Sequence, residues 1–117
     1  RDIASPAISS FTADGESVTA TTNGDTVDLA FSLDDGSGVG DMEYQIKVTN
    51  PGGTTTTPVA WTDTDLGDGQ SGSVTISNFS LEATPTDGSY TISLEARDQL
   101  LNTPVSSQSI TVIRDTT

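Results

Sequence analysis

The sequence predicts an all-β domain whose antiparallel strands form a two-layer sandwich. Apolar and polar residues alternate along several short runs, which is the two-residue period of a half-buried strand, and no run has helical periodicity. Abundant Thr and Ser and 11 glycines supply the residues typical of strands and turns. A chain of 117 residues is long enough for one hydrophobic core and too short for two. We therefore expect a single domain over residues 1–117.

The first half of the chain contains five predicted strands separated by polar turns. The clearest runs from Val27 to Leu33, where four apolar residues alternate with Asp28, Ala30 and Ser32. The others are Ile8–Phe11, a short strand at Val18, Met42–Val48 and a weaker strand, Thr54–Thr62, which carries Val59 and Trp61. Turns are expected at Asp14-Gly15, Asp34–Asp41 and Asn50–Gly53.

The second half contains three predicted strands, which brings the total to seven or eight. They are Val74–Phe79, Tyr90–Ala96 and Ile110–Ile113. The segments Asp63–Gly72, Thr84–Gly88 and Asp98–Pro104 are expected to connect the strands. This number of short strands with regular turns is typical of a Greek-key sandwich.

Tyr90 narrows the fold class to an immunoglobulin-like sandwich. It begins the penultimate strand directly after the Asp87-Gly88 turn. An immunoglobulin-like sandwich has a corner tyrosine at this place, whose hydroxyl binds backbone a few residues upstream.

Composition excludes several classes of chemistry. The chain has no Cys and no His, so disulfides, thiolate nucleophiles, the usual zinc sites and His-based triads are absent. Carboxylates such as Asp34 and Asp98 could in principle cleave glycosides, but loops at the rim of a sandwich offer no deep, dry cleft. We therefore expect no enzymatic activity.

The net charge of −13 disfavours nucleic acid and anionic membrane as partners. Only four basic residues are present (Arg1, Lys47, Arg97 and Arg114), too few for a basic patch. No apolar run is long enough to span a bilayer. Most of the 17 acidic residues are Asp, which favours turns and supplies oxygen ligands for calcium. The charge as a whole is explained equally well by calcium binding and by a role in solubility or adaptation to salty surroundings.

A short signature occurs twice, at Arg1-Asp2 and at Arg114-Asp115. Recurrence at this distance suggests one unit of a tandem array. Residues 1–5 and 114–117 are then expected to be linker segments between units.

The sequence also resembles bacterial Ig-like repeats of the extender regions of large surface adhesins, including repeats-in-toxin-type adhesins. The resemblance lies in Gly88–Ile92, Ala96-Arg97-Asp98, Asn102, Ile110–Val112 and Asp115–Thr117, and in Asp35–Val39 followed by Tyr44. It departs from such repeats at Asp98–Asn102, where Gly usually precedes Asn, and at Asp2–Pro6. The resemblance implies an extracellular protein, secreted or at a bacterial cell surface, with neighbouring copies of the repeat as partners.

An immunoglobulin-like sandwich would gather acidic residues at its two ends. We expect Asp2, Asp34, Asp35, Asp41, Asp98 and Asn102 at the end where the chain enters, and Asp14, Glu16, Glu82, Asp87 and Asp115 at the other. Carboxylates about 5 Å apart repel by roughly 3 kcal/mol at an effective dielectric near 20, so a junction between units would favour a bridging cation. Calcium, which takes six to eight oxygen ligands, suits this role.

The resemblance likewise implies calcium at the linkers between repeats. On matching positions it nominates Asp2, Asp98, Asn102 and Asp115 as ligands, with Asp34, Asp35, Glu82 and Asp87 as further candidates. Each of these residues also suits an ordinary turn or strand end, and this alternative stays open. An unrelated loop site at Asp63–Gly69 is a further alternative, although that segment departs from an EF-hand in spacing and lacks the final Glu.

Taken together, the sequence predicts a monomeric, non-catalytic extender repeat that is stiffened by calcium and projects a distal adhesive domain. The alternative is a module that itself binds carbohydrate or protein, for which Trp61 is the plausible stacking platform; a lone Trp in a sandwich is more often in the core. A viral or phage surface domain of the same fold is a third possibility.

Overall fold

The computed structural model describes residues 7–34, 42–63, 71–98 and 106–116, and within these ranges it contains eight strands and no helix. There is consequently no helix among them that could cross a membrane. The strands are β1 (Ala7–Ala13), β2 (Thr19–Thr22), β3 (Thr26–Asp34), β4 (Met42–Thr49), β5 (Thr55–Asp63), β6 (Ser71–Ser80), β7 (Gly88–Asp98) and β8 (Ser106–Arg114).

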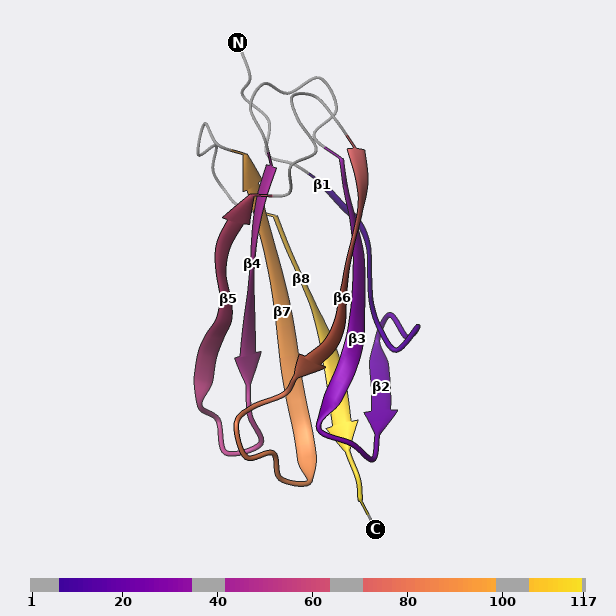
Figure 1. Cartoon of the computed structure of the whole chain (residues 1–117), viewed down its shortest axis with the longest axis vertical. Helices are drawn as coiled ribbons and strands as arrows, with labels where there is room; N and C mark the ends of the chain where they lie inside the picture. The colour runs from indigo at the N-terminus through magenta and orange to yellow at the C-terminus, as the bar shows by residue number, and fades with distance from the viewer. Residues whose placement is uncertain (1–6, 35–41, 64–70, 99–105, 117) are drawn as a thin grey trace.

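The strands form two packed sheets, as Figure 1 shows. One sheet has the order β1-β3-β6 and the other the order β2-β8-β7-β4-β5. Every pairing is antiparallel except that between β2 and β8, which is parallel. The chain therefore changes sheets between β1 and β2. This arrangement is an immunoglobulin-like sandwich, and the predicted fold class is confirmed.

The predicted strands all occur, with small differences at their ends. Val18 lies just before β2, in the segment between the Asp14-Gly15 turn and the point where β2 pairs with β8. Its side chain is 74% exposed, because this segment has not yet joined the sheet. β5 extends one residue further than expected, to Asp63, where it pairs with Glu43. The structure also places Asp14 away from the sandwich ends. Its Oδ1 accepts a hydrogen bond from Asp28 N at 2.8 Å, and the β1–β2 connection projects from the side of the molecule (Figure 1).

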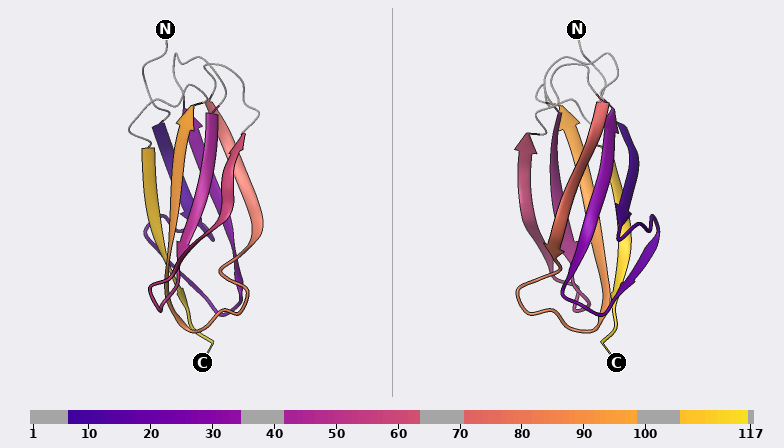
Figure 2. Two further views of the ribbon diagram at one scale, coloured as in Figure 1. Left: turned by 90° about the vertical axis from the view of Figure 1, so that its left-hand side faces the viewer. Right: turned by 45° about the vertical axis from the view of Figure 1, so that its right-hand side comes forward.

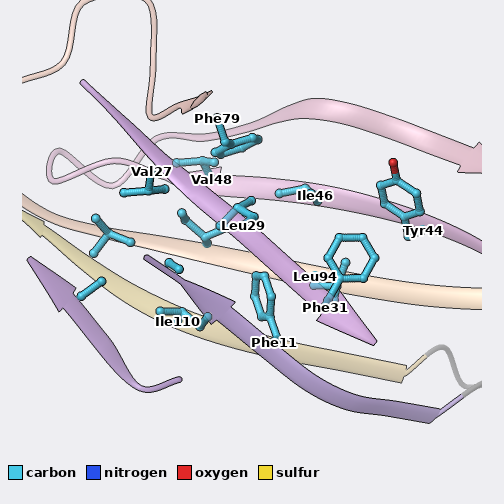
Figure 3. Packing of buried hydrophobic residues seen from close by; sticks show 14 of the residues in the cluster. Phe11, Val27, Leu29, Phe31, Tyr44, Ile46, Val48, Phe79, Leu94 and Ile110 are labelled. Carbon is cyan, nitrogen blue, oxygen red and sulfur yellow. The ribbon is translucent and has the colours of Figure 1, made fainter. Parts of the chain in front are cut away.

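The core lies between the sheets and is built by the alternation seen in the sequence. In β4 the side chains of Met42, Tyr44, Ile46 and Val48 are buried, and the residues between them are not. Figure 3 shows Tyr44, Ile46 and Val48 of β4 facing residues of β3 across the core. The Phe31 ring contacts Phe11 and Tyr44 edge-on, with centroid distances of 6.3 and 5.0 Å. Such edge-to-face packing suits the quadrupoles of aromatic rings.

Tyr90 is the predicted corner tyrosine. Its side chain is fully buried, and its hydroxyl accepts a hydrogen bond from Thr86 N at 2.9 Å and donates one to Thr86 O at 3.2 Å. The buried hydroxyl therefore gains both a donor and an acceptor from the turn before β7. The expectation from the Asp-Gly turn is confirmed.

The sandwich is elongated, with extents of 53 × 24 × 19 Å. Its strands run along the long axis, which the two views of Figure 2 make clear. We call the end at which β1 begins the N-terminal pole, and the end at which β8 finishes the C-terminal pole. The described chain thus enters at one pole and leaves at the opposite one.

Candidate functional sites at the two poles

At the N-terminal pole three strands end in an aspartate. β3, β5 and β7 run in the same direction, and their last residues are Asp34, Asp63 and Asp98. Asp34 pairs with Ala7 and Ser71, whereas Asp98 pairs with Met42. The predicted position of Asp34 and Asp98 at one end of the sandwich is therefore correct. The other residues expected there, Asp2, Asp35, Asp41 and Asn102, lie outside the described residues.

Asp63 belongs to the same pole, whereas the sequence considered it only as part of an unrelated loop site at Asp63–Gly69, the rest of which lies outside the described residues. The alternation of apolar residues along this strand is weak, since Thr and Pro dominate it, so the sequence placed Asp63 in a loop. Within the described ranges, no three acidic side chains stand close enough together to hold a metal ion. The described part of the N-terminal pole thus has an aspartate at the end of each of these three strands.

At the C-terminal pole, Arg114 connects three segments of the chain. Its Nη1 lies 2.9 Å from Asp87 Oδ1, and its Nη2 lies 2.8 Å from Asp25 Oδ1. Its Nε also donates to Gly24 O at 3.1 Å. The Arg114 side chain is only 16% exposed, so these ion pairs are partly shielded from solvent. The last residue of β8 is thereby held to the β2–β3 turn and to the β6–β7 connection.

Asp87, a predicted calcium ligand, is an acceptor in this network. Besides Arg114, it accepts hydrogen bonds from Thr116 Oγ1 at 3.0 Å and from Thr116 N at 3.4 Å. Asp115 follows β8 directly, and its backbone N donates to Thr22 O at 2.9 Å. The contacts among Arg114, Asp25, Asp87 and Thr116 were not predicted from the sequence, because nothing in the spacing of these residues shows that the fold brings them together.

Glu82, the remaining candidate at this pole, lines a pocket of about 270 Å³ between the start of β5 and the segment that follows β6. Among the described residues, the ion pairs and hydrogen bonds of Arg114 and Asp87 do not include Glu82.

Trp61 lies on the outer face of the larger sheet, not in the core. The guanidinium of Arg97 stacks over its ring, 3.9 Å from the centroid, and Arg97 Nε also donates to Glu43 Oε1 at 3.0 Å. Trp61 is half-buried by these contacts. Tyr44, the other aromatic of this sheet edge, points into the core. The expectation of a core tryptophan is wrong, because the alternation in β5 shifts at its bulges relative to β4.

Comparison with known proteins supports the fold and no closer relationship. No family model matches the sequence, and no curated protein matches it as a relative. Among solved structures, the CARDB domain of the PF1109 protein from Pyrococcus furiosus, solved in complex with di-metal ions, has a TM-score of 0.57 and 13% identity. The match covers 98% of each chain.

Two further structures show weaker likeness. The periplasmic chaperone SfaE has a TM-score of 0.48 and 13% identity over 90% of this chain and 57% of its own. A family 76 glycoside hydrolase from a bovine Bacteroides thetaiotaomicron strain has a TM-score of 0.45 and 13% identity over 94% of this chain and 21% of its own. At these identities the likeness shows the sandwich fold alone.

Proposed function

We propose that this domain is a non-catalytic extender unit of a bacterial cell-surface or secreted adhesin, one of several similar units in series. The observation that carries the proposal is the placement of the chain's entry and exit at opposite poles of a sandwich 53 Å long. Units joined end to end in this way line up along their long axes. With linkers of only a few residues, each domain then adds its full length to the array. The recurring Arg-Asp signature supports the same arrangement.

The ion-pair network at the C-terminal pole suits a unit that carries load along its axis. Arg114, the last residue of β8, is fastened to Asp25 and Asp87 on two other segments. Force applied to the chain after residue 114 would therefore be shared by several connections. The residues at which the chain leaves the domain are therefore held against the sandwich by these contacts.

Calcium at the junctions is the second part of the proposal. Asp34 and Asp98, the last residues of β3 and β7, lie at the N-terminal pole, where a preceding unit's Asp115 would arrive in a serial array. A cation between facing carboxylates relieves their repulsion and favours the aligned arrangement over bent ones. Asp2, Asp35 and Asn102 are the further ligands we propose there. Metal ions bound in a CARDB domain are compatible with this use of the fold.

Small-angle X-ray scattering on two copies of residues 1–117 joined end to end tests both parts. We expect a longest dimension of roughly twice 53 Å with millimolar calcium and a shorter, more variable particle after chelation. The changes Asp34→Asn and Asp98→Asn should abolish the response, while Glu16→Gln, in the β1–β2 turn, should preserve it. A side-by-side particle in all conditions would refute the extender role. An extended particle whose dimensions do not change with calcium would refute the proposed stiffening by calcium and leave the extender role standing.

A second candidate, a module that binds carbohydrate, is favoured by the position of Trp61 on the outer surface. An indole face can stack on a sugar ring, but here Arg97 already covers one face. A glycan array probed with the wild-type domain and with Trp61→Ala separates the candidates: binding that the substitution abolishes supports the module, and absence of binding supports the extender.

A further inference from the structure

The pocket beside Glu82 combines an apolar floor with a single carboxylate. Val48 and Leu81, both buried, and the exposed Ala83 supply its apolar part. Its polar lining consists of Asn50, Thr54, Thr56, Thr84 and Glu82. At about 270 Å³ it is slightly below the 300–1,000 Å³ range typical of small-molecule sites, so it suits a side chain or a fragment better than a drug-sized ligand.

One wall of the pocket is fixed by the turn between β4 and β5. Asn50 Oδ1 accepts a hydrogen bond from Thr54 N at 2.9 Å, and Asn50 N donates to Thr54 O at the same distance. Gly53 N also donates to Asn50 O at 2.9 Å. Opposite this wall, Ser80 Oγ donates to Glu82 O at 3.0 Å and holds the backbone of the carboxylate-bearing residue. The pocket therefore exists before any ligand arrives.

The carboxylate of Glu82 is incompletely satisfied. Its Oε2 is shielded from solvent, and it is the one such side-chain oxygen or nitrogen within the described ranges that has no hydrogen-bond partner. Burying part of a charged group without a donor costs free energy, which a cation nearby would recover. Because Oε2 is enclosed, we expect an occupant of the pocket to bind at the other oxygen, Oε1, and to offset the negative charge that the two oxygens share.

The described cations of the chain are engaged elsewhere. Lys47 Nζ lies 3.4 Å from Glu95, Arg97 pairs with Glu43, and Arg114 pairs with Asp25 and Asp87. Glu82 thus has no cationic partner in the part of the chain that the structure describes. A positive charge for this pocket must come from outside those residues.

We propose that the pocket binds a primary alkylammonium group on a short hydrocarbon stem, as at the end of a lysine side chain of a partner protein. Val48, Leu81 and Ala83 would contact the stem, and Glu82 together with threonine hydroxyls would accept hydrogen bonds from the ammonium. An ammonium has three donors on a compact charge and needs no paired acceptors. A guanidinium is bound best by two oxygens of one carboxylate, and Glu82 offers one.

Calcium fits this pocket less well than the ammonium does. A calcium ion requires six to eight oxygens, usually with several carboxylates, whereas the lining has one carboxylate and an apolar floor. This inference stands apart from the extender proposal, since it concerns a lateral pocket near the C-terminal pole and not the junction itself.

A titration followed by ¹H–¹⁵N NMR tests the proposal on residues 1–117. The probe is Nα-acetyl-lysine N-methylamide, and its norleucine counterpart, which has the same stem without the charge, is the control ligand. We expect the lysine probe to shift amides of residues 48–56 and 81–84 with an affinity on the order of 1 mM, because a ligand this small makes few contacts. The norleucine probe should leave them unshifted.

Two protein variants show which groups carry the binding. Glu82→Gln should weaken the lysine probe by about tenfold or more, since a charge-assisted hydrogen bond is lost, while Glu16→Gln removes the same charge elsewhere and should have no effect. Ala83→Leu fills the pocket from its exposed rim and should abolish binding with Glu82 intact. Wild-type peak dispersion in each variant confirms that it is folded.

Three results would overturn the proposal. Equal affinity of the wild type and of Glu82→Gln for the lysine probe would show that the Glu82 carboxylate does not take part in binding the ammonium. Equal or tighter binding of the corresponding arginine analogue would show that the pocket does not prefer an ammonium to a guanidinium. Displacement of the lysine probe by calcium at the same amides would show that the pocket is a metal site.

Discussion

The ring of Pro51 occupies the space in which a side chain at position 88 would begin. A Cβ atom on Gly88 would lie 2.8 Å from Pro51 Cβ and 2.9 Å from Pro51 Cγ. Gly88 also has a φ of +138°, which residues with a side chain rarely adopt. The first residue of β7 is thus packed directly against the turn between β4 and β5. This contact joins two connections at the C-terminal pole that are far apart in sequence.

Gly88→Ala should destabilise the domain by about 2 kcal/mol or more, because it adds both a clash and backbone strain. The matched control is Gly53→Ala, at a φ of +92° with nothing within 4 Å of the new Cβ, which carries strain without the clash. Urea unfolding measures both variants. If the two lose the same stability, the Pro51 contact contributes nothing beyond the backbone conformation.

Tyr90→Phe should lower the free energy of unfolding by about 1–2 kcal/mol. The substitution keeps the buried ring but leaves Thr86 N and Thr86 O without the hydroxyl they bind. Tyr44→Phe at neutral pH is the matched control, because no hydrogen bond from the Tyr44 hydroxyl is found among the described residues. Equal losses from the two substitutions, measured by thermal and urea unfolding, would contradict a stabilising role for the corner.

Arg114→Leu should cost about 1–3 kcal/mol of stability, since a largely shielded guanidinium loses two ion pairs and a bond to Gly24 O. Lys47→Met, which removes a single more exposed ion pair at 3.4 Å, should cost well under about 1 kcal/mol. Chemical denaturation of both variants provides the measurement. A loss at Lys47 as large as that at Arg114 would mean that burial and the number of partners do not decide the effect.

The strands could be predicted from the sequence because their physical cause is local. In a strand such as β3 or β4, every second residue is apolar and faces the core. The Asp-Gly pair before Tyr90 likewise indicates the corner turn. The position of Asp34 and Asp98 at one pole then follows from the direction of the strands. These features need no knowledge of distant contacts.

The side-chain environment of the poles could not be predicted in the same way. Arg114 is brought to Asp25 and Asp87 by pairings between β2, β7 and β8 across long stretches of sequence. Trp61 was misplaced because bulges between β4 and β5 shift its register by amounts that alternation does not reveal. The periodicity of each strand could therefore be predicted from the sequence. Contacts that depend on how strands distant in sequence align with one another could not.

Stability should fall at alkaline pH partly through Tyr44. Burial raises the pKa of its hydroxyl above the ordinary value of 10.0, because the charged form is poorly solvated beside the core. Below pH 10 Tyr44 is neutral in both states, so its contribution is constant. As pH rises above 10 the unfolded chain loses this proton while the folded domain retains it, so the unfolded state gains stability relative to the folded one.

Tyr44→Phe removes that linkage and keeps the ring against Phe31. We expect the free energy of unfolding of the variant to decline less steeply above pH 10 than that of the wild type, by up to about 1.4 kcal/mol per pH unit between the two pKa values. Urea unfolding across neutral to alkaline pH, with tyrosinate absorbance followed in parallel, gives both quantities. Superimposable pH profiles for the two proteins would show that Tyr44 ionises equally in the folded and unfolded states. That result would place its hydroxyl in water and not at the edge of the core.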